Sequence, residues 1–192
     1  MEYVDPIKDI HKITAIKRIL KKQSLRDLLL FVFGINTGLR VSELLSLRVG
    51  DIWEDGKFKE FLYLKDGKTS EERAFYLNQN VREAAKHYLE TFDFSIDDYL
   101  FKSKKNQQPI SRQQAYRIIN CAAKEVGITG KIGTHTLRKT FGYHAYRKGI
   151  AISILMNIYH HHSPGETLRY LGIDKNEITI YGTYSADGNT RY

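Results

Sequence analysis

Residues 159–170 read Tyr-His-His-His-Ser-Pro-Gly-Glu-Thr-Leu-Arg-Tyr. This order predicts the end of one helix, a tight connection and the start of another. Ser163 is a good helix cap, Pro164 suits the first helical position, and Glu166 stands where a capping box has its acidic residue. Tyr170 then falls about two turns into the new helix, so the capped turn fixes where its hydroxyl points. We therefore interpret Tyr170 as a candidate nucleophile.

The length and composition indicate a basic globular protein. The 192 residues suffice for one well-buried domain and are short for two, and 42% of them are hydrophobic. The net charge of +8 favours a polyanionic partner such as nucleic acid, although an inert basic surface would carry the same charge. Cys121 is the single cysteine, which excludes a disulfide framework and a thiolate zinc site. No signal peptide opens the chain and no apolar run approaches ~18 residues, so we expect a cytoplasmic protein.

Apolar spacing and capping residues predict a chain that is mainly helical. The segment 24–38 is apolar nearly all round, which is typical of a helix at the centre of a core. One strand region stands out, where the aromatic and aliphatic segments 58–64 and 73–77 flank a turn. We therefore predict an α+β domain, mainly α-helical with a small antiparallel β-sheet. Helices are expected at residues 11–22, 24–38, 40–47, 78–92, 111–126, 134–148, 151–159 and 175–181.

Further side chains could do chemistry, and each also has a purely structural interpretation. Arg40 and Glu43 are three residues apart on one predicted helix, so they share a face and could form only a surface ion pair. His135 and Arg138 have the same spacing on another helix, where a lone histidine is more often a buried hydrogen-bonding group. Lys68 falls on the tip of the predicted hairpin, where most lysines are merely solvated. Only their combination with the candidate nucleophile indicates a function.

The adjacent histidines 160–162 raise the question of a metal site. Consecutive helical residues point about 100° apart, so these side chains cannot all face one ion. The His-Glu-x-x-His pattern of zinc proteases is also missing from the sequence. We therefore expect neither a metal nor another cofactor.

The motifs in this order resemble the catalytic domain of the tyrosine recombinase or phage integrase family. Residues 37–44, Thr-Gly-Leu-Arg-Val-Ser-Glu-Leu, resemble the family's first arginine motif, with Arg40 at the catalytic arginine. Lys68 resembles the family's β-hairpin lysine, and His135-Thr-Leu-Arg138 resembles its His-x-x-Arg motif. Each motif is weak alone, but the combination in one order is highly specific.

The resemblance also selects a histidine and a tyrosine by counting. The family places its second histidine nine residues before the nucleophilic tyrosine, which matches His161 and Tyr170. Thr167, six residues after His161, fits as well. His160-His161-His162 stands where Gly-His-Ser or Asn-His-Ser is commoner in the family, so His161 is chosen by register.

The resemblance spans residues 6–180, and we expect one catalytic domain over 1–192 with a loose tail at 185–192. The family's amino-terminal core-binding domain, which closes over the far side of the DNA, is missing from these residues. We expect either a catalytic fragment or a protein that works without that clamp.

The resemblance implies site-specific DNA recombination by strand breakage and rejoining. Tyr170 would attack a phosphodiester and form a 3′-phosphotyrosyl link, which stores the bond energy, so that rejoining needs neither ATP nor metal. Arg40 and Arg138 would grip the non-bridging oxygens of the pentacoordinate transition state. The remaining roles concern protons and orientation: His135 and His161 move protons, Lys68 protonates the departing 5′ oxygen, and Glu43 orients its neighbours.

The partners implied are double-stranded DNA and other copies of the chain. The resemblance implies a homotetramer on two synapsed DNA sites, with a monomer as an expected free form. Residues 174–181 carry apolar side chains on a short element and are expected to dock on a neighbouring subunit. The implied setting is the cytoplasm of a bacterium, on nucleoid DNA, for a protein of bacterial or phage origin.

Two alternative functions use the same residues. A type IB topoisomerase-like enzyme would relax any supercoiled plasmid without needing a specific site. A basic DNA-binding protein with a dead site would bind duplex DNA and never become covalently attached to it. A nicked suicide duplex, followed by a denaturing gel, separates the last alternative from the other two.

Overall fold

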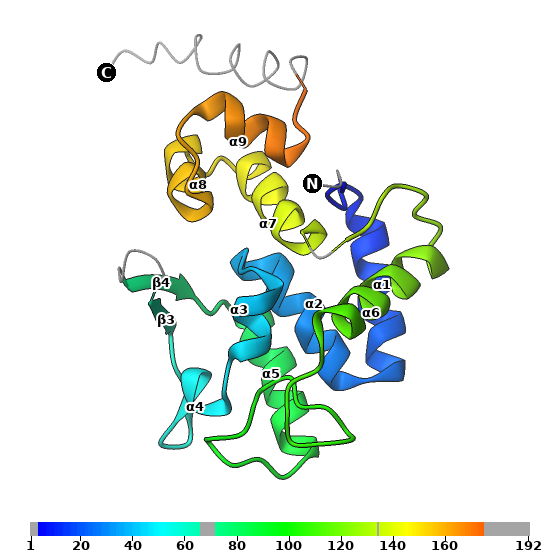
Figure 1. Ribbon diagram of the computed structural model, residues 1–192, viewed down its shortest axis with the longest axis vertical. Coiled ribbons are helices and arrows are strands. Elements are labelled where there is room, and N and C mark those ends of the chain that lie inside the picture. The colour runs from blue at the N-terminus through cyan, green and yellow to red at the C-terminus, as the bar shows by residue number, and fades with distance from the viewer. Residues whose placement is uncertain (1–3, 66–71, 134, 175–192) are drawn as a thin grey trace, which may run out of the picture. The chain divides into compact units, whose positions relative to one another are not determined.

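In the computed structural model, residues 4–65, 72–133 and 135–174 are described. The chain divides into two compact units, residues 1–141 and 142–192. Helices dominate the described part of both units, and the first unit also contains two small antiparallel sheets (Figure 1). The prediction of a mainly helical α+β fold with a small antiparallel sheet is confirmed.

Along the described sequence of the first unit, four helices precede two β-hairpins and two helices follow them. Its elements are α1 (Ile10–Gln23), α2 (Leu25–Thr37), α3 (Val41–Ser46), α4 (Val49–Ile52), β1 (Trp53–Glu54), β2 (Lys57–Phe58), β3 (Phe61–Lys65), β4 (Glu72–Tyr76), α5 (Gln79–Thr91) and α6 (Arg112–Glu125). One helix crosses the boundary between the units, and two shorter helices follow it. These are α7 (Thr136–Arg147), α8 (Ile152–Tyr159) and α9 (Pro164–Leu171).

Helix α2 is the central helix of the first unit, as its composition predicts. Side chains on all its faces are buried, Phe31 and Phe33 completely. Helices α1, α3, α5 and α6 pack against it. The Ser24 Oγ accepts the Asp27 N–H at 3.3 Å at its start, and Gly38, with φ 69°, ends it in the left-handed conformation. The C-terminal end of α2 is therefore a fixed point of the core.

The predicted strand region is split in the structure, which corrects the sequence interpretation. Phe58 belongs to a separate hairpin in which it pairs with Trp53, across a turn where Asp55 and Gly56 both have positive φ. An Asp-Gly pair favours such tight turns, so this hairpin has a sequence signal. The second hairpin begins only at Phe61 and pairs β3 with β4. One face of it is buried and the other is exposed.

The second unit is built around two helix ends. His160 ends α8 with φ 58°, a left-handed conformation that is uncommon for a residue with a Cβ. Ser163 caps α9, its Oγ accepting the Glu166 N–H at 3.2 Å, so the predicted helix start is confirmed. The expected capping box takes another form, because the Glu166 carboxylate accepts the N–H of His162 at 2.9 Å instead of that of the cap residue. The carboxylate therefore fixes the residue that precedes the cap.

Close packing of α7 against α8 and α9 depends on Gly142. A Cβ at this position would overlap the hydroxyl of Tyr159 and lie 2.5 Å from Leu171. Both side chains are buried. The predictions for Lys68, for the first residue of the helix at 134–148, for the helix at 175–181 and for the tail at 185–192 fall outside the described residues.

Candidate active site

The crossing of α7 over α2 places Arg138. A Cβ at Gly34 would lie 2.5 Å from the Leu137 side chain, and one at Gly38 would overlap the ring of Phe141. The two glycines are one turn apart on α2, as are their partners on α7, so the backbones approach closely along one seam. Beside this seam the Arg138 Nη1 donates to the carbonyl oxygen of Gly38. Arg138 is thereby buried beneath the turn that leads to α3.

Arg40 stands at the other side of that turn, as the residue before α3. Its N–H donates to Oε2 of Glu43 at 2.7 Å, and its Nη1 lies 3.2 Å from Oε1 of the same carboxylate. The predicted pair therefore exists, but with Arg40 as the cap of the helix and not as a helical residue. The Arg40 side chain is 39% exposed, whereas that of Glu43 is 18% exposed. The guanidinium of Arg40 can therefore meet a ligand from solvent.

Arg73 is a site residue that the sequence interpretation missed. It lies on β4, and its Nη2 forms an ion pair with Oε1 of Glu43. Burial alone would raise the pKa of Glu43, but the Arg40 N–H and the Arg73 guanidinium outweigh this and hold the pKa below its ordinary value. In the β-strand alternation Arg73 shares the inward face with Phe75. A charged residue at an inward strand position requires a partner, and this was the available signal.

His135 lies in a cationic environment at the start of α7. Its carbonyl oxygen accepts the Lys139 N–H at 2.9 Å, so it occupies the turn just before the helix and not the helix itself. Partial burial lowers the pKa of its imidazole, and the charges of Arg138, Lys139, Arg112 and Arg40 lower it further, in that order. The neutral imidazole is therefore favoured near neutral pH, where it can accept a proton.

The second unit holds the other two predicted groups, His161 and Tyr170. Their rings meet edge to face with centroids 5.1 Å apart. The Nδ1 of His161 lies 3.0 Å from Oγ1 of Thr167, which is fully buried. Tyr159 packs against both rings, at 5.5 Å from His161 and 5.1 Å from Tyr170. Tyr170 remains partly exposed, whereas the neighbouring histidines 160 and 162 are exposed.

The hydrogen bond to Thr167 bears on the tautomer of His161. The Thr167 hydroxyl is 3.5 Å from the carbonyl oxygen of Ser163, to which it can donate. A hydroxyl that donates there accepts from a protonated Nδ1 of His161, which leaves Nε2 as the acceptor nitrogen. This arrangement gives the second unit a phenol and a potential proton acceptor side by side.

The first unit also carries a basic groove at the end of α2 remote from Gly38. It comprises two pockets that share lining residues, and its walls are the N-terminal ends of α2 and α6, the C-terminal end of α5 and the loop 102–107. Two of its cations are paired, Arg26 with Asp27 at 2.7 Å and Lys102 with Asp98 at 3.0 Å. Within the described ranges the other cations of the lining have no carboxylate partner, and these are Lys21, Lys22, Lys104, Lys105 and Arg117.

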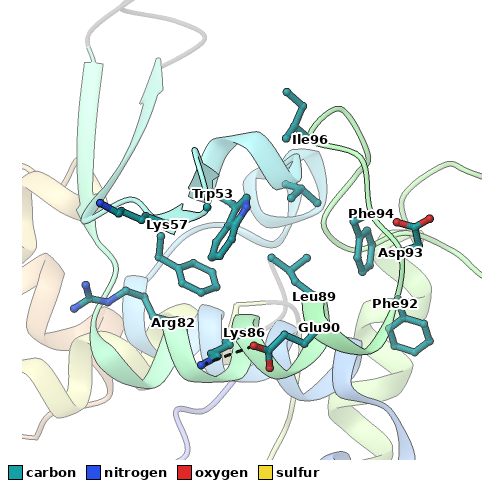
Figure 2. Close-up of a pocket in the computed structure, with 13 residues that line it drawn as sticks. Trp53, Lys57, Arg82, Lys86, Leu89, Glu90, Phe92, Asp93, Phe94 and Ile96 are labelled. Atoms are coloured by element: carbon teal, nitrogen blue, oxygen red, sulfur yellow. Dashed lines mark ion pairs between the residues drawn. The ribbon is translucent and has the colours of Figure 1, made fainter.

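A separate apolar hollow of about 610 Å³ lies over one face of α5 (Figure 2). Trp53, Phe58 and Leu89 form its apolar wall. None of the residues predicted for catalysis lines it.

Among the described residues no three His, Cys, Asp or Glu side chains form a cluster that could hold a metal ion. Residues 4–65, 72–133 and 135–174 also contain no helix that is long and apolar enough to cross a membrane.

Comparison with known proteins identifies relatives over most of the chain. The family model described as "Phage integrase family" matches residues 6–177. The chain is 42% identical to the probable integrase/recombinase YoeC of Bacillus subtilis (strain 168), an alignment that covers 98% of this chain and 99% of the relative. It is 33% identical to the tyrosine recombinase XerC of Thermodesulfovibrio yellowstonii, covering 81% of this chain but 53% of the relative. A crystal structure of the XerH site-specific recombinase bound to palindromic difH substrate, a post-cleavage complex, has the same fold, with a TM-score of 0.71, 21% identity and coverage of 93% of this chain and 52% of that one.

Proposed function

The chain belongs to the phage integrase family, and from this premise we propose that it is a tyrosine-type site-specific recombinase. It breaks a DNA strand by forming a 3′-phosphotyrosyl link and rejoins the strand to a different 5′ hydroxyl. The observation that carries this proposal is the contact between Arg138 and the Gly38 carbonyl, because it places one arginine beneath the turn that presents Arg40. The names of its relatives, which are integrases and recombinases, favour strand exchange over the relaxation of supercoils.

The two arginines carry the charge of the transition state. A phosphodiester under attack becomes pentacoordinate, and its equatorial oxygens gain negative charge. Arg40 and Arg138 each offer a planar fork of N–H donors that suits two phosphate oxygens. Because α2 and its packing hold them before the substrate arrives, they need little rearrangement at the moment of reaction.

Proton transfer falls to the histidines and a lysine. A tyrosine phenol has a reference pKa of ~10, so attack by Tyr170 requires a proton acceptor. We assign this role to His161, because its ring meets that of Tyr170 edge to face and its Nδ1 lies 3.0 Å from Oγ1 of Thr167. We assign to His135, whose neutral imidazole is favoured, a hydrogen bond to the same phosphate. We assign protonation of the departing 5′ oxygen to Lys68, whose position lies outside the described residues.

Beyond the reacting phosphate, the duplex is held electrostatically. We assign this role to the basic groove, whose lysines lie with the N-terminal ends of α2 and α6. Helix N-termini and lysines both favour phosphate oxygens. The chain then works as one catalytic domain on nucleoid DNA in a bacterial cytoplasm, as a homotetramer when two sites are synapsed.

Covalent trapping tests this function on many DNA sequences at once. The probe is a library of nicked suicide duplexes with a randomised core. Cleavage near the nick releases a short fragment that carries the 5′ hydroxyl, and because this fragment diffuses away the strand cannot be rejoined. We expect wild-type protein to retain selected duplexes through denaturation, and mass spectrometry to place the nucleotide on the peptide that contains Tyr170. If no duplex is retained, the dead-site alternative replaces this function. Recovery of every sequence equally would favour the topoisomerase-like alternative.

A further inference from the structure

One carboxylate in the first unit serves two arginines from different parts of the chain. Oε2 of Glu43 accepts the Arg40 N–H at 2.7 Å, and Oε1 lies 3.2 Å from the Arg40 Nη1. The same Oε1 pairs with Nη2 of Arg73, 30 residues further along the chain. Glu43 is thus the junction between α3 and the β3–β4 hairpin, and it connects Arg73 with an arginine that we place on the phosphate.

The three side chains differ in exposure, and this decides which of them is fixed. Arg73 is 15% exposed and Glu43 18%, whereas Arg40 is 39% exposed. Ion pairs that are shielded from solvent are less screened than exposed pairs. The ring of Phe75, 5.3 Å from the Arg73 guanidinium carbon, adds a second contact that restricts Arg73. The Arg73–Glu43 pair is therefore the anchored part, and Arg40 is the part that a ligand can reach from solvent.

Sharing the carboxylate also limits how strongly it holds Arg40. With Arg73 in place, the negative charge of Glu43 is divided between two guanidiniums. Without Arg73, the carboxylate of Glu43 would act on Arg40 with its full charge and would compete with the phosphate for the donors of that arginine. The carboxylate would also lose the ion pair that fixes its orientation relative to Arg40.

We propose that Arg73 is a positioning residue that acts through Glu43 on Arg40, keeping the Arg40 guanidinium in place and available for the scissile phosphate. This inference rests on the proposed function and adds a residue to it. A purely architectural ion pair between β4 and α3 would stabilise the fold without influencing how Arg40 meets phosphate charge.

The test uses the duplex recovered from the library, prepared in two forms. One form has an ordinary phosphodiester at the cleavage position, and the other has a neutral methylphosphonate, which lacks the charge that Arg40 neutralises. We expect Arg73→Gln to slow single-turnover cleavage of the phosphodiester by roughly 10- to 100-fold, the effect of a misplaced catalytic group. On the methylphosphonate we expect the variant and wild type to cleave at similar rates. The ratio of the two rates is independent of the folded fraction, because both substrates meet the same protein.

Two further variants separate the charge from the shape of the side chain. Arg73→Lys keeps a charge but loses the fork, so it should fall between wild type and Arg73→Gln on the phosphodiester. Adding Glu43→Gln to Arg73→Gln removes the competing carboxylate and should restore part of the lost rate. Arg48→Gln is the matched control, because Arg48 also lies over an aromatic ring, that of Tyr99 at 4.3 Å, and the contacts described for it involve none of the site residues.

The possible results of these cleavage assays distinguish a failure of this inference from a failure of the proposed recombinase function. An equal loss of rate on both substrates, or no loss with Arg73→Gln, overturns the inference while the proposed function stands. Failure of wild-type protein to form an adduct on either substrate overturns the proposed function and the inference together.

Discussion

The two units hold their functional side chains by opposite means. In the first unit, Arg138 and the turn before Arg40 are fixed from beneath by α2, whose side chains are buried on all faces. In the second unit, Tyr170 lies on α9, which has only eight residues and depends on an exposed local cap. The comparison teaches that the arginines proposed to bind phosphate are placed by a buried core helix, whereas the proposed nucleophile lies on a helix that begins with a short-range cap.

The largest effect should come from the nucleophile itself. Tyr170→Phe removes one oxygen, so the covalent adduct should disappear entirely while the ring packing against Tyr159 and His161 is kept. Tyr159→Phe is the control, because it deletes a phenol from the same cluster. Trapping on the suicide duplex measures both. An adduct that persists in Tyr170→Phe would show that another tyrosine attacks.

The two arginines should separate catalysis from stability. Arg40→Ala and Arg138→Ala should each lower the cleavage rate on the order of 10²- to 10³-fold, because each loses a donor to the transition state. Arg138→Ala should also reduce the free energy of unfolding by about 1–3 kcal/mol, since the Gly38 carbonyl loses its buried donor. Urea unfolding checks this difference. Equal stability of both variants would contradict the view that only Arg138 belongs to the core.

The basic groove should be visible in the salt dependence of DNA binding. Each phosphate contact contributes a slope of about −0.9 to log K against log salt, so Lys104→Gln with Lys105→Gln should reduce the steepness by up to about 2. The control removes the same charge elsewhere, at Lys57 and Lys86, which line the apolar hollow. If both double variants have the same slope of log K against log salt, the basic groove is not part of the DNA interface.

Packing of the second unit should be sensitive to the addition of one methyl group at Gly142. Gly142→Ala introduces a methyl group where Tyr159 and Leu171 already lie, which should cost about 1–3 kcal/mol of stability. Gly165→Ala is the matched control in the same unit, because its added methyl group has no described atom within 4 Å apart from its chain neighbours and the nearby backbone of its own helix. Thermal unfolding of the two variants compares them. A loss with Gly165→Ala as large as that with Gly142→Ala would mean that crowding is not the cause.

The smallest effect should be the pH dependence of stability at His135. The pKa of the native imidazole lies below its ordinary value of 6.5, so just below that pH the unfolded chain binds more protons than the native protein. Stability therefore falls as the pH drops through this window. His135→Gln should lose less stability than wild type between neutral and mildly acidic pH, as measured by urea unfolding. The same loss in both proteins would assign the acid sensitivity to other groups.

Features set by neighbouring residues could be predicted from the sequence. Ser24, Gly38 and Ser163 end or begin helices where the capping rules place them, because each acts on a backbone group within a few residues. His161 is selected by the spacing that the family resemblance implies, and its ring lies against that of Tyr170, while its catalytic role stays a prediction.

Features set by distant residues could not be predicted. Arg73 acquires its role only through a carboxylate 30 residues away. The burial of Arg138 depends on a carbonyl 100 residues earlier in the chain. The hairpin at Trp53 is a different case, because its Asp55-Gly56 turn is a local signal whereas its strands have only two residues each, too few for an alternating pattern.

The close contact of Gly34 and Gly38 with α7 has a consequence for how this sequence can evolve. Gly34 faces Leu137 and Gly38 faces Phe141, with no room for one more carbon at either place. A mutation at one member of a pair can therefore persist only if its partner changes in compensation. Among homologues, positions 34 and 137 should vary together, with a larger residue at the first accompanied by a smaller one at the second. Position 38 should be more constrained than position 34, because its backbone conformation also favours glycine.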